Sequence, residues 1–115
     1  MNIVRHDPGA ILSSAVEYGN LVFVAGTVAD DTSQDAEGQT RQILAQIDSL
    51  LKRAGTDKSR ILWANVWVTD IRNRDGMNKA WLTWVDPANP PARATVEAKL
   101  ADPAMLVEIA CVAGK

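Results

Sequence analysis

Glu108 is the residue of this chain whose type is least expected at its position. It is the one charged side chain in the run LVEIACVA at residues 106–113, and both alternating faces of that run are otherwise apolar. An unpaired carboxylate is very costly to bury, so Glu108 must be paired, lie at a sheet edge or open onto a cavity. A carboxylate in an apolar cavity is a candidate general base. A structural ion pair or an edge position is the alternative.

Arg93 is the second candidate, because it follows the rigid segment PPA at residues 90–92 and immediately precedes an alternating run. A guanidinium with a fixed direction can grip a carboxylate through two parallel hydrogen bonds, which a lysine cannot imitate. An arginine at a strand start is otherwise solvated or salt-bridged. The case for a site strengthens if Arg93 and Glu108 face one pocket, which adjacent antiparallel strands would permit. The sequence then predicts a site for a small molecule that carries a carboxylate.

Other common catalytic arrangements are missing from the sequence. His6 is the single histidine, and no spacing around it suggests a serine–histidine–aspartate triad or a metal site. Gly26 has no glycine-rich phosphate loop around it. Cys111 is the single cysteine and lies in an apolar run, so we expect a small buried hydrophobic residue rather than a reactive thiol.

The composition narrows the classes of partner. The chain has 115 residues, a net charge of -2 and a single cysteine, which fits one domain, residues 1–115, in a reducing compartment. The nearest basic pair, Arg72 and Arg74, is diluted by Asp70 and Asp75, so we expect no tight nucleic-acid binding. No stretch is apolar and long enough for a signal core or a membrane span. We therefore expect a cytoplasmic protein with no membrane partner.

Hydrophobic periodicity predicts two helices. Residues 35–54 carry an apolar stripe at helical spacing, with acidic residues near the start, basic residues near the end, and Gly55 after it. Residues 73–85, with Asn73 as N-cap, carry a second stripe. Short apolar or alternating runs predict strands at residues 2–6, 15–18, 21–25, 61–69, 94–100 and 106–113, with a hairpin turn at 19–20. This order predicts an α+β domain with two helices on one face of a mixed β-sheet.

The predicted strand at residues 61–69 has two different faces. One face is aliphatic and consists of Leu62, Ala64, Val66 and Val68. The other face carries two tryptophans and consists of Trp63, Asn65, Trp67 and Thr69. Two tryptophans on a sheet face need cover, either from a helix or from a neighbouring subunit.

Over nearly its whole length the sequence resembles the RidA/YjgF family of reactive-intermediate deaminases, also called translation-inhibitor-like proteins. The segments that carry the resemblance are 19–26 (GNLVFVAG), the helix with Gln39 and Thr40 that ends at 54–55, 65–70 (NVWVTD), 77–81 (MNKAW), 91–97 (PARATVE) and 107–109 (VEI). The resemblance implies a chorismate-mutase-like α+β fold. It also implies a homotrimer whose sheets form a central barrel, with clefts between the subunits.

The family's site residues match five positions of this sequence. The carboxylate-binding arginine matches Arg93, and the water-orienting glutamate matches Glu108. The helix asparagine matches Asn78, the glycine of a Ser-Gly-Gln element matches Gly26, and Thr95 stands where the family often has a cysteine whose backbone binds substrate. The implied reaction is hydrolysis of enamine or imine acids of the 2-aminoacrylate and 2-iminopropionate type to 2-oxo acids and ammonia, with no cofactor.

Three departures from the family pattern bear on substrate preference. Ala25 and Thr27 replace the serine and the glutamine of the Ser-Gly-Gln element, and Leu12 falls where a tyrosine is expected. Three alternatives therefore stay open beside the deaminase. They are a non-catalytic trimer that binds or senses a small metabolite, a deaminase of a larger enamine acid such as 2-aminomuconate, and an endoribonuclease. The acidic charge balance counts against the last.

Overall fold

The structure is a computed structural model that describes residues 2–115. These residues form two α-helices, six strands and two short 3₁₀ helices. The helices are α1 (Ala36–Arg53) and α2 (Arg74–Trp84), and the 3₁₀ helices are η1 (Lys58–Arg60) and η2 (Ile71–Asn73). The strands are β1 (Ile3–His6), β2 (Ala15–Tyr18), β3 (Leu21–Thr27), β4 (Ile61–Val68), β5 (Ala92–Glu97) and β6 (Val107–Gly114). Within residues 2–115, no helix is both long and apolar enough to cross a membrane.

Helix α1 begins and ends where the sequence predicts. Asp35 caps its first turn by accepting a hydrogen bond from the backbone N–H of Gly38 at 2.8 Å. Gly55 follows the C-cap with a φ of +80°, a conformation that glycine adopts without strain. The apolar stripe is fully buried and includes Ile43, Leu44, Ile47 and Leu51. The amphipathic pattern therefore determines which face of α1 meets the sheet.

Helix α2 agrees with the prediction in place but not in the capping detail. Asn73 is the N-cap, yet its side chain makes no capping hydrogen bond. The turn before the helix is instead held by Asp70, whose carboxylate accepts a hydrogen bond from the backbone N–H of Arg72 at 2.9 Å. The helix ends at Trp84, because Val85 leaves the helical conformation with a ψ of 141°. Pro87 then prevents continuation.

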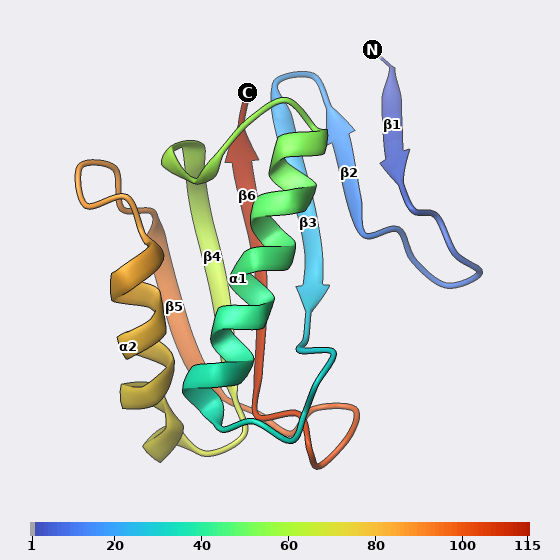
Figure 1. Ribbon diagram of the computed structural model, residues 1–115. Coiled ribbons are helices and arrows are strands. Elements are labelled where there is room, and N and C mark those ends of the chain that lie inside the picture. The colour runs from blue at the N-terminus through green and yellow to red at the C-terminus, as the bar shows by residue number, and fades with distance from the viewer. Residues whose placement is uncertain (1) are drawn as a thin grey trace.

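The six strands form one mixed sheet in the order β1-β2-β3-β6-β4-β5 (Figure 1). Every pairing is antiparallel except that of β4 with β5, which is parallel. A parallel pair needs a crossover connection, and α2 supplies it. The predicted α+β fold with a mixed sheet and two helices is confirmed.

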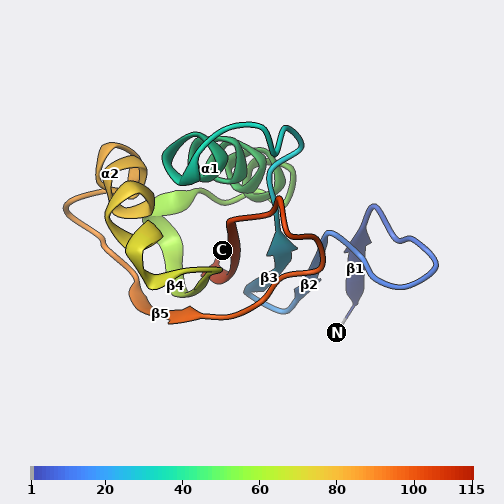
Figure 2. The ribbon, with the colours of Figure 1, turned by 90° about the horizontal axis from the view of Figure 1, so that it is seen from below.

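Both helices lie on the same side of the sheet, and no helix of residues 2–115 covers the other side (Figure 2). The core fills the space between α1, α2 and the central strands. Its fully buried strand residues include Val22, Val66, Val68, Val107 and Ile109. The opposite face of the same strands is open in the isolated chain. We call it the helix-free face.

Two details of the predicted strands are wrong. The sequence predicts Leu62 on the aliphatic face, but this residue is 54% exposed, because the register between β4 and β6 shifts between Ile61 and Trp63. Ile61 takes the buried position instead. The strand predicted at residues 94–100 begins earlier and ends earlier, since pairing with β4 starts at Ala92 and stops at Glu97.

Candidate functional site

Arg93 lies on the helix side of the sheet. It is opposite Ala64 in the parallel β4–β5 register, and Ala64 is fully buried beneath the helices. Residues opposite each other in a sheet point to the same face, so Arg93 points toward α2. Its Nη1 is 3.7 Å from the Sδ of Met77, and its guanidinium stacks 5.0 Å from the ring of Trp81.

No carboxylate of residues 2–115 pairs with this guanidinium. Burial first, and the like charge of Arg74 second, lower the pKa of Arg93 below its usual value. An arginine nevertheless remains protonated in proteins. Arg93 is thus a half-buried cation without a counter-ion, which is a suitable receptor for a carboxylate from outside the chain.

Thr95 and Asn78 lie on the strand that carries Arg93 and on the helix that contacts it, respectively. Thr95 is two residues further along β5 and so points to the same face. Its Oγ1 is buried and, within the described chain, has no hydrogen-bond partner. Asn78 follows Met77 on α2 and is half-buried. We call Arg93, Thr95 and Asn78 the arginine half-site.

Glu108 lies on the helix-free face. It is opposite Trp67 of β4, on the side away from the buried residues Val107 and Ile109. Ala110 and Val112 follow it on that face. The carboxylate takes part in none of the ion pairs among residues 2–115. The half-buried acid therefore opens onto an apolar surface.

Gly26 makes room for this carboxylate. The register between β3 and β6 shifts between Val24 and Thr27, which brings Gly26 against Glu108. A Cβ placed on Gly26 would overlap the Oε2 of Glu108 and lie 3.0 Å from its Cδ. The position thus requires glycine as long as the carboxylate keeps its place. We call Gly26 and Glu108 the glutamate half-site.

The condition that would permit Arg93 and Glu108 to face one pocket of a single chain, adjacent antiparallel strands, is not met. Strand β4 lies between β5 and β6, and β5 is parallel to β4. The register then turns Arg93 toward the helices and Glu108 toward the helix-free face. One chain therefore carries two separate half-sites, each with an unpaired charge.

The three departures from the family pattern lie near or beyond the glutamate half-site. Ala25 and Thr27 flank Gly26, and the Thr27 hydroxyl donates to the backbone oxygen of Ala25 at 2.9 Å. Leu12 is 62% exposed in the loop between β1 and β2. The Thr27 hydroxyl is thus used within the chain.

Gln39 is a site-supporting residue that the sequence reasoning did not single out. It is fully buried on α1, and its Nε2 donates to the backbone oxygens of Gln34 and Ala104, each at 3.0 Å, and of Thr32 at 3.2 Å. Its Oε1 accepts from the backbone N–H of Leu106 at 2.9 Å. Gln39 therefore ties the loop after β3 to the loop before β6, the two strands of the glutamate half-site. A polar residue one turn before Ile43 in the apolar stripe is the signal that could have found it.

The prediction for Cys111 is confirmed. Cys111 is 4% exposed, and burial raises the pKa of its thiol to about 12, so it packs as a small hydrophobic residue. The Nε2 of His6 lies 2.5 Å from the carboxylate of Glu17, on the hairpin of β1 and β2. Within residues 2–115, no cluster of three or more potential ligand residues could hold a metal ion.

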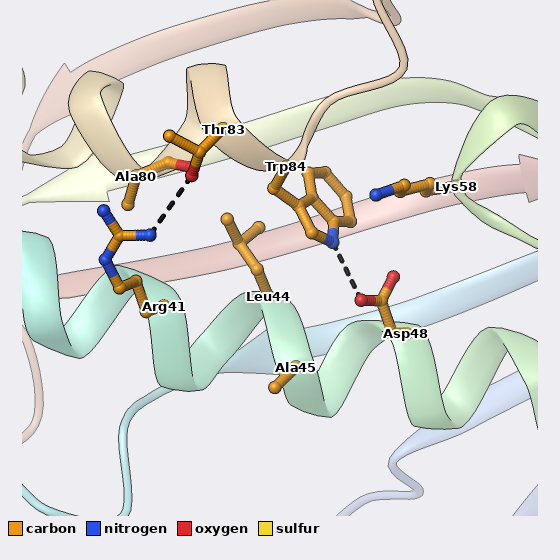
Figure 3. A pocket seen from close by; sticks show the side chains of 8 residues that line it. All are labelled: Arg41, Leu44, Ala45, Asp48, Lys58, Ala80, Thr83 and Trp84. Atoms are coloured by element: carbon orange, nitrogen blue, oxygen red, sulfur yellow. Dashed lines mark hydrogen bonds between the residues drawn. The ribbon is translucent and has the colours of Figure 1, made fainter.

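A hollow of about 270 Å³ lies between α1 and α2, away from both half-sites (Figure 3). Its polar side chains bond to one another: the indole of Trp84 donates to Asp48 at 2.9 Å, and Arg41 donates to Thr83 at 3.1 Å. None of the predicted site residues lines it. The hollow belongs to the packing of the two helices.

Comparison with known proteins identifies the family. Residues 3–115 match the family described as endoribonuclease L-PSP. A RutC family protein of Haemophilus influenzae is 46% identical over 114 residues, covering 98% of each chain, and the RutC family protein YoaB of Escherichia coli is 42% identical over 113 residues, again 98% of each. A crystal structure of a YjgF family member from Neisseria meningitidis superposes with a TM-score of 0.97 at 38% identity, over 100% of this chain and 96% of that one. The chain belongs to the RidA/YjgF family.

Proposed function

We propose that this chain is a hydrolytic deaminase of enamine and imine acids whose active site forms between two protomers of a homotrimer. The observation that carries the proposal is the separation of two incomplete half-sites onto opposite sides of one sheet. The arginine half-site offers an unpaired cation, and the glutamate half-site offers an unpaired carboxylate. A second copy of the chain can bring the two together, because each lies where another molecule can reach it.

The helix-free face supplies the surface for such an assembly. By the strand register, this face carries large apolar side chains that are 36–49% exposed in the isolated chain, namely Ile3, Tyr18, Leu21, Phe23, Trp63 and Val96. A contiguous apolar patch across a whole sheet is unusual on a monomer and is typical of an interface. Three copies that turn this face inward bury it as a common core.

The reaction follows from the two charges. Arg93 binds the substrate carboxylate through its guanidinium, with the Thr95 hydroxyl as a further donor, and so fixes the direction of the C=N bond. Glu108 of the neighbouring protomer accepts a proton from a water molecule as the water oxygen bonds to the imine carbon. That proton passes to the imine nitrogen and gives a carbinolamine. Glu108 then transfers the hydroxyl proton of the carbinolamine to the nitrogen, the C–N bond breaks as the C=O bond forms, and ammonia and the 2-oxo acid are released.

The protein needs to supply only a modest rate enhancement, because imines hydrolyse readily in water. A positioned general base contributes about 10²–10⁴-fold, and orientation of the reacting groups adds to it. These two effects require only a carboxylate grip and one base. The residues of the two half-sites provide both.

A coupled assay tests the activity. A dehydratase that depends on pyridoxal phosphate generates the 2-aminoacrylate or its imine, and ammonia release is followed with and without the purified chain. We expect acceleration by the wild-type protein and a loss of about 10²-fold or more in kcat/KM for Arg93→Ala, since a charge-assisted hydrogen bond is lost. Arg93→Lys keeps the positive charge but lacks the planar guanidinium, so it should recover only part of the lost kcat/KM. A wild-type protein that does not accelerate ammonia release would refute the deaminase.

A complementation experiment tests the composite site. Neither Arg93→Ala nor Glu108→Ala should be active alone. After the two variants are unfolded together and refolded, random assembly gives about one quarter of the interfaces both wild-type groups, so about a quarter of the activity should return. If each site lay within one chain, no activity would return.

Trp63→Asp, on the helix-free face, should convert the trimer into a folded monomer and abolish turnover. Light scattering measures the change in assembly.

The description of the family as endoribonucleases favours a second candidate, RNA cleavage. The net charge of -2 speaks against it, as does the pairing of Arg41, Arg53 and Arg72 with carboxylates of the same chain. Incubation of highly purified protein with labelled RNA separates the two functions. Degradation that disappears with Glu108→Ala would support the nuclease, and degradation that persists would indicate contamination.

A further inference from the structure

The two flanks of α2 face different neighbours. Gly76 lies against α1, since a Cβ added to it would be 3.6 Å from the backbone nitrogen of Glu37. Thr83, two turns later, accepts a hydrogen bond from Arg41 of α1 at 3.1 Å. One flank of α2 therefore packs against α1.

Arg74 lies on the opposite flank, beside the arginine half-site. With about 100° of rotation per residue, Arg74 and Asn78 are about half a turn around the helix from the α1 flank. Met77 and Trp81 are three and seven residues after Arg74, and these two side chains contact Arg93. Arg74, Asn78 and Arg93 thus converge at the edge where α2 covers β5.

Within residues 2–115, no carboxylate pairs with Arg74 or with Arg93. Arg74 lies one turn of α2 before Met77, whose Sδ is 3.7 Å from the Nη1 of Arg93, and the like charge of Arg74 adds to burial in lowering the pKa of Arg93. Within residues 2–115, neither arginine forms an ion pair, whereas Arg41, Arg53 and Arg72 all do. The Oγ1 of Thr95 is buried on the same face of β5 and has no partner there. Two cations and a free hydroxyl are therefore available to a ligand with more than one negative group.

We propose that Arg74 is a second anion-binding residue of this site and that the preferred substrates are 2-imino acids with a second, distal carboxylate. The proposal rests on the proposed function for the identity of the reacting group. Arg93 and Thr95 bind the carboxylate next to the imine, and Arg74 binds the distal carboxylate at the first turn of α2. The base Glu108 comes from the neighbouring protomer on the imine side, so the distal carboxylate is the group that neutralises Arg74.

Binding of 2-oxo acids, the product class, tests this without turnover. 2-Oxopentanedioate and 2-oxopentanoate have the same chain length and differ in the distal carboxylate, so isothermal titration of both isolates its contribution. We expect the wild-type protein to bind the diacid about tenfold more tightly, with a preference that weakens as salt is added. Arg74→Gln should remove the preference and leave the affinity for the monoacid within about twofold, while Arg74→Lys should retain part of it.

Arg72→Gln is the matched control. It removes the same charge two residues away, but Arg72 is held by Asp70 at 2.5 Å, so the preference should persist. Either of two results with the wild-type protein would overturn the proposal: equal binding of the two acids, or binding of neither. An unchanged preference in Arg74→Gln, or an equal loss of the preference in Arg72→Gln, would also overturn it. An Arg74-dependent preference without any ammonia release would leave the site standing and refute the deaminase. Turnover of monocarboxylic imines by a protein that does not prefer the diacid would support the deaminase and refute the role of Arg74.

Discussion

Gln39→Met is the substitution whose effect can be worked out most fully. Methionine keeps nearly the same volume, so it leaves no cavity in the core. It removes the one acceptor of the Leu106 backbone N–H and all three donations to the loop carbonyls. The change therefore isolates the hydrogen bonds that hold the two loops together.

The loss in the free energy of unfolding follows from the backbone groups that lose a hydrogen-bond partner in this variant. A buried N–H left without an acceptor costs about 1–3 kcal/mol. The three carbonyls belong to surface loops and can turn toward water, so they add little. We expect the free energy of unfolding to fall by about 2 kcal/mol, equivalent to a decrease of about 8 °C in Tm for a chain of this size. We also expect kcat of the proposed deaminase to fall by about tenfold, because both loops lead into the strands that place Gly26 and Glu108.

Urea denaturation and thermal unfolding measure the loss, both at one protomer concentration, since assembly shifts the apparent stability. Gln42→Met is the control, because Gln42 lies on the same helix and bonds the backbone of Asp31 through both amide atoms at 2.9 Å, but in an exposed position. It should cost less than about 0.5 kcal/mol. If Gln39→Met is as stable as Gln42→Met, the loops do not depend on the buried amide.

Three further predictions concern single groups. Gly26→Ala should lower kcat about 10²-fold with little change in Tm, because the new methyl group displaces the Glu108 carboxylate; an active variant would show that this contact does not matter. Cys111 should react with a thiol reagent at pH 8 only after unfolding, since burial raises its pKa to about 12, and rapid labelling of the native protein would contradict this. The hydrogen bond from Lys115, followed by that from His6, lowers the pKa of Glu17 below its ordinary 4.5, so its stabilisation is complete above that pH and is lost as the pH falls through the lowered value. Lys115→Met should therefore flatten the decline of the urea midpoint between pH 5 and pH 3, and equal slopes would count against the contact.

The sequence by itself determined the features that arise from neighbouring residues. The stripe that includes Ile43 and Ile47 predicts α1, with Asp35 at its start and Gly55 after its end, because caps and amphipathic faces are set within a few residues. The hairpin across residues 19–20 follows from local turn chemistry in the same way. The match of short segments to a family identified Arg93 and Glu108 as residues worth locating.

Only the tertiary structure decided where these two residues point. Strand pairing between distant segments is not encoded in local periodicity, and the parallel placement of β5 beside β4 turned Arg93 toward the helices. A one-residue register shift likewise exposed Leu62, and another brought Gly26 against Glu108. Each of these outcomes depends on hydrogen bonds between strands far apart in the chain, because one residue of register reverses the face that a side chain occupies. The division of the site into two half-sites is therefore a property of the sheet.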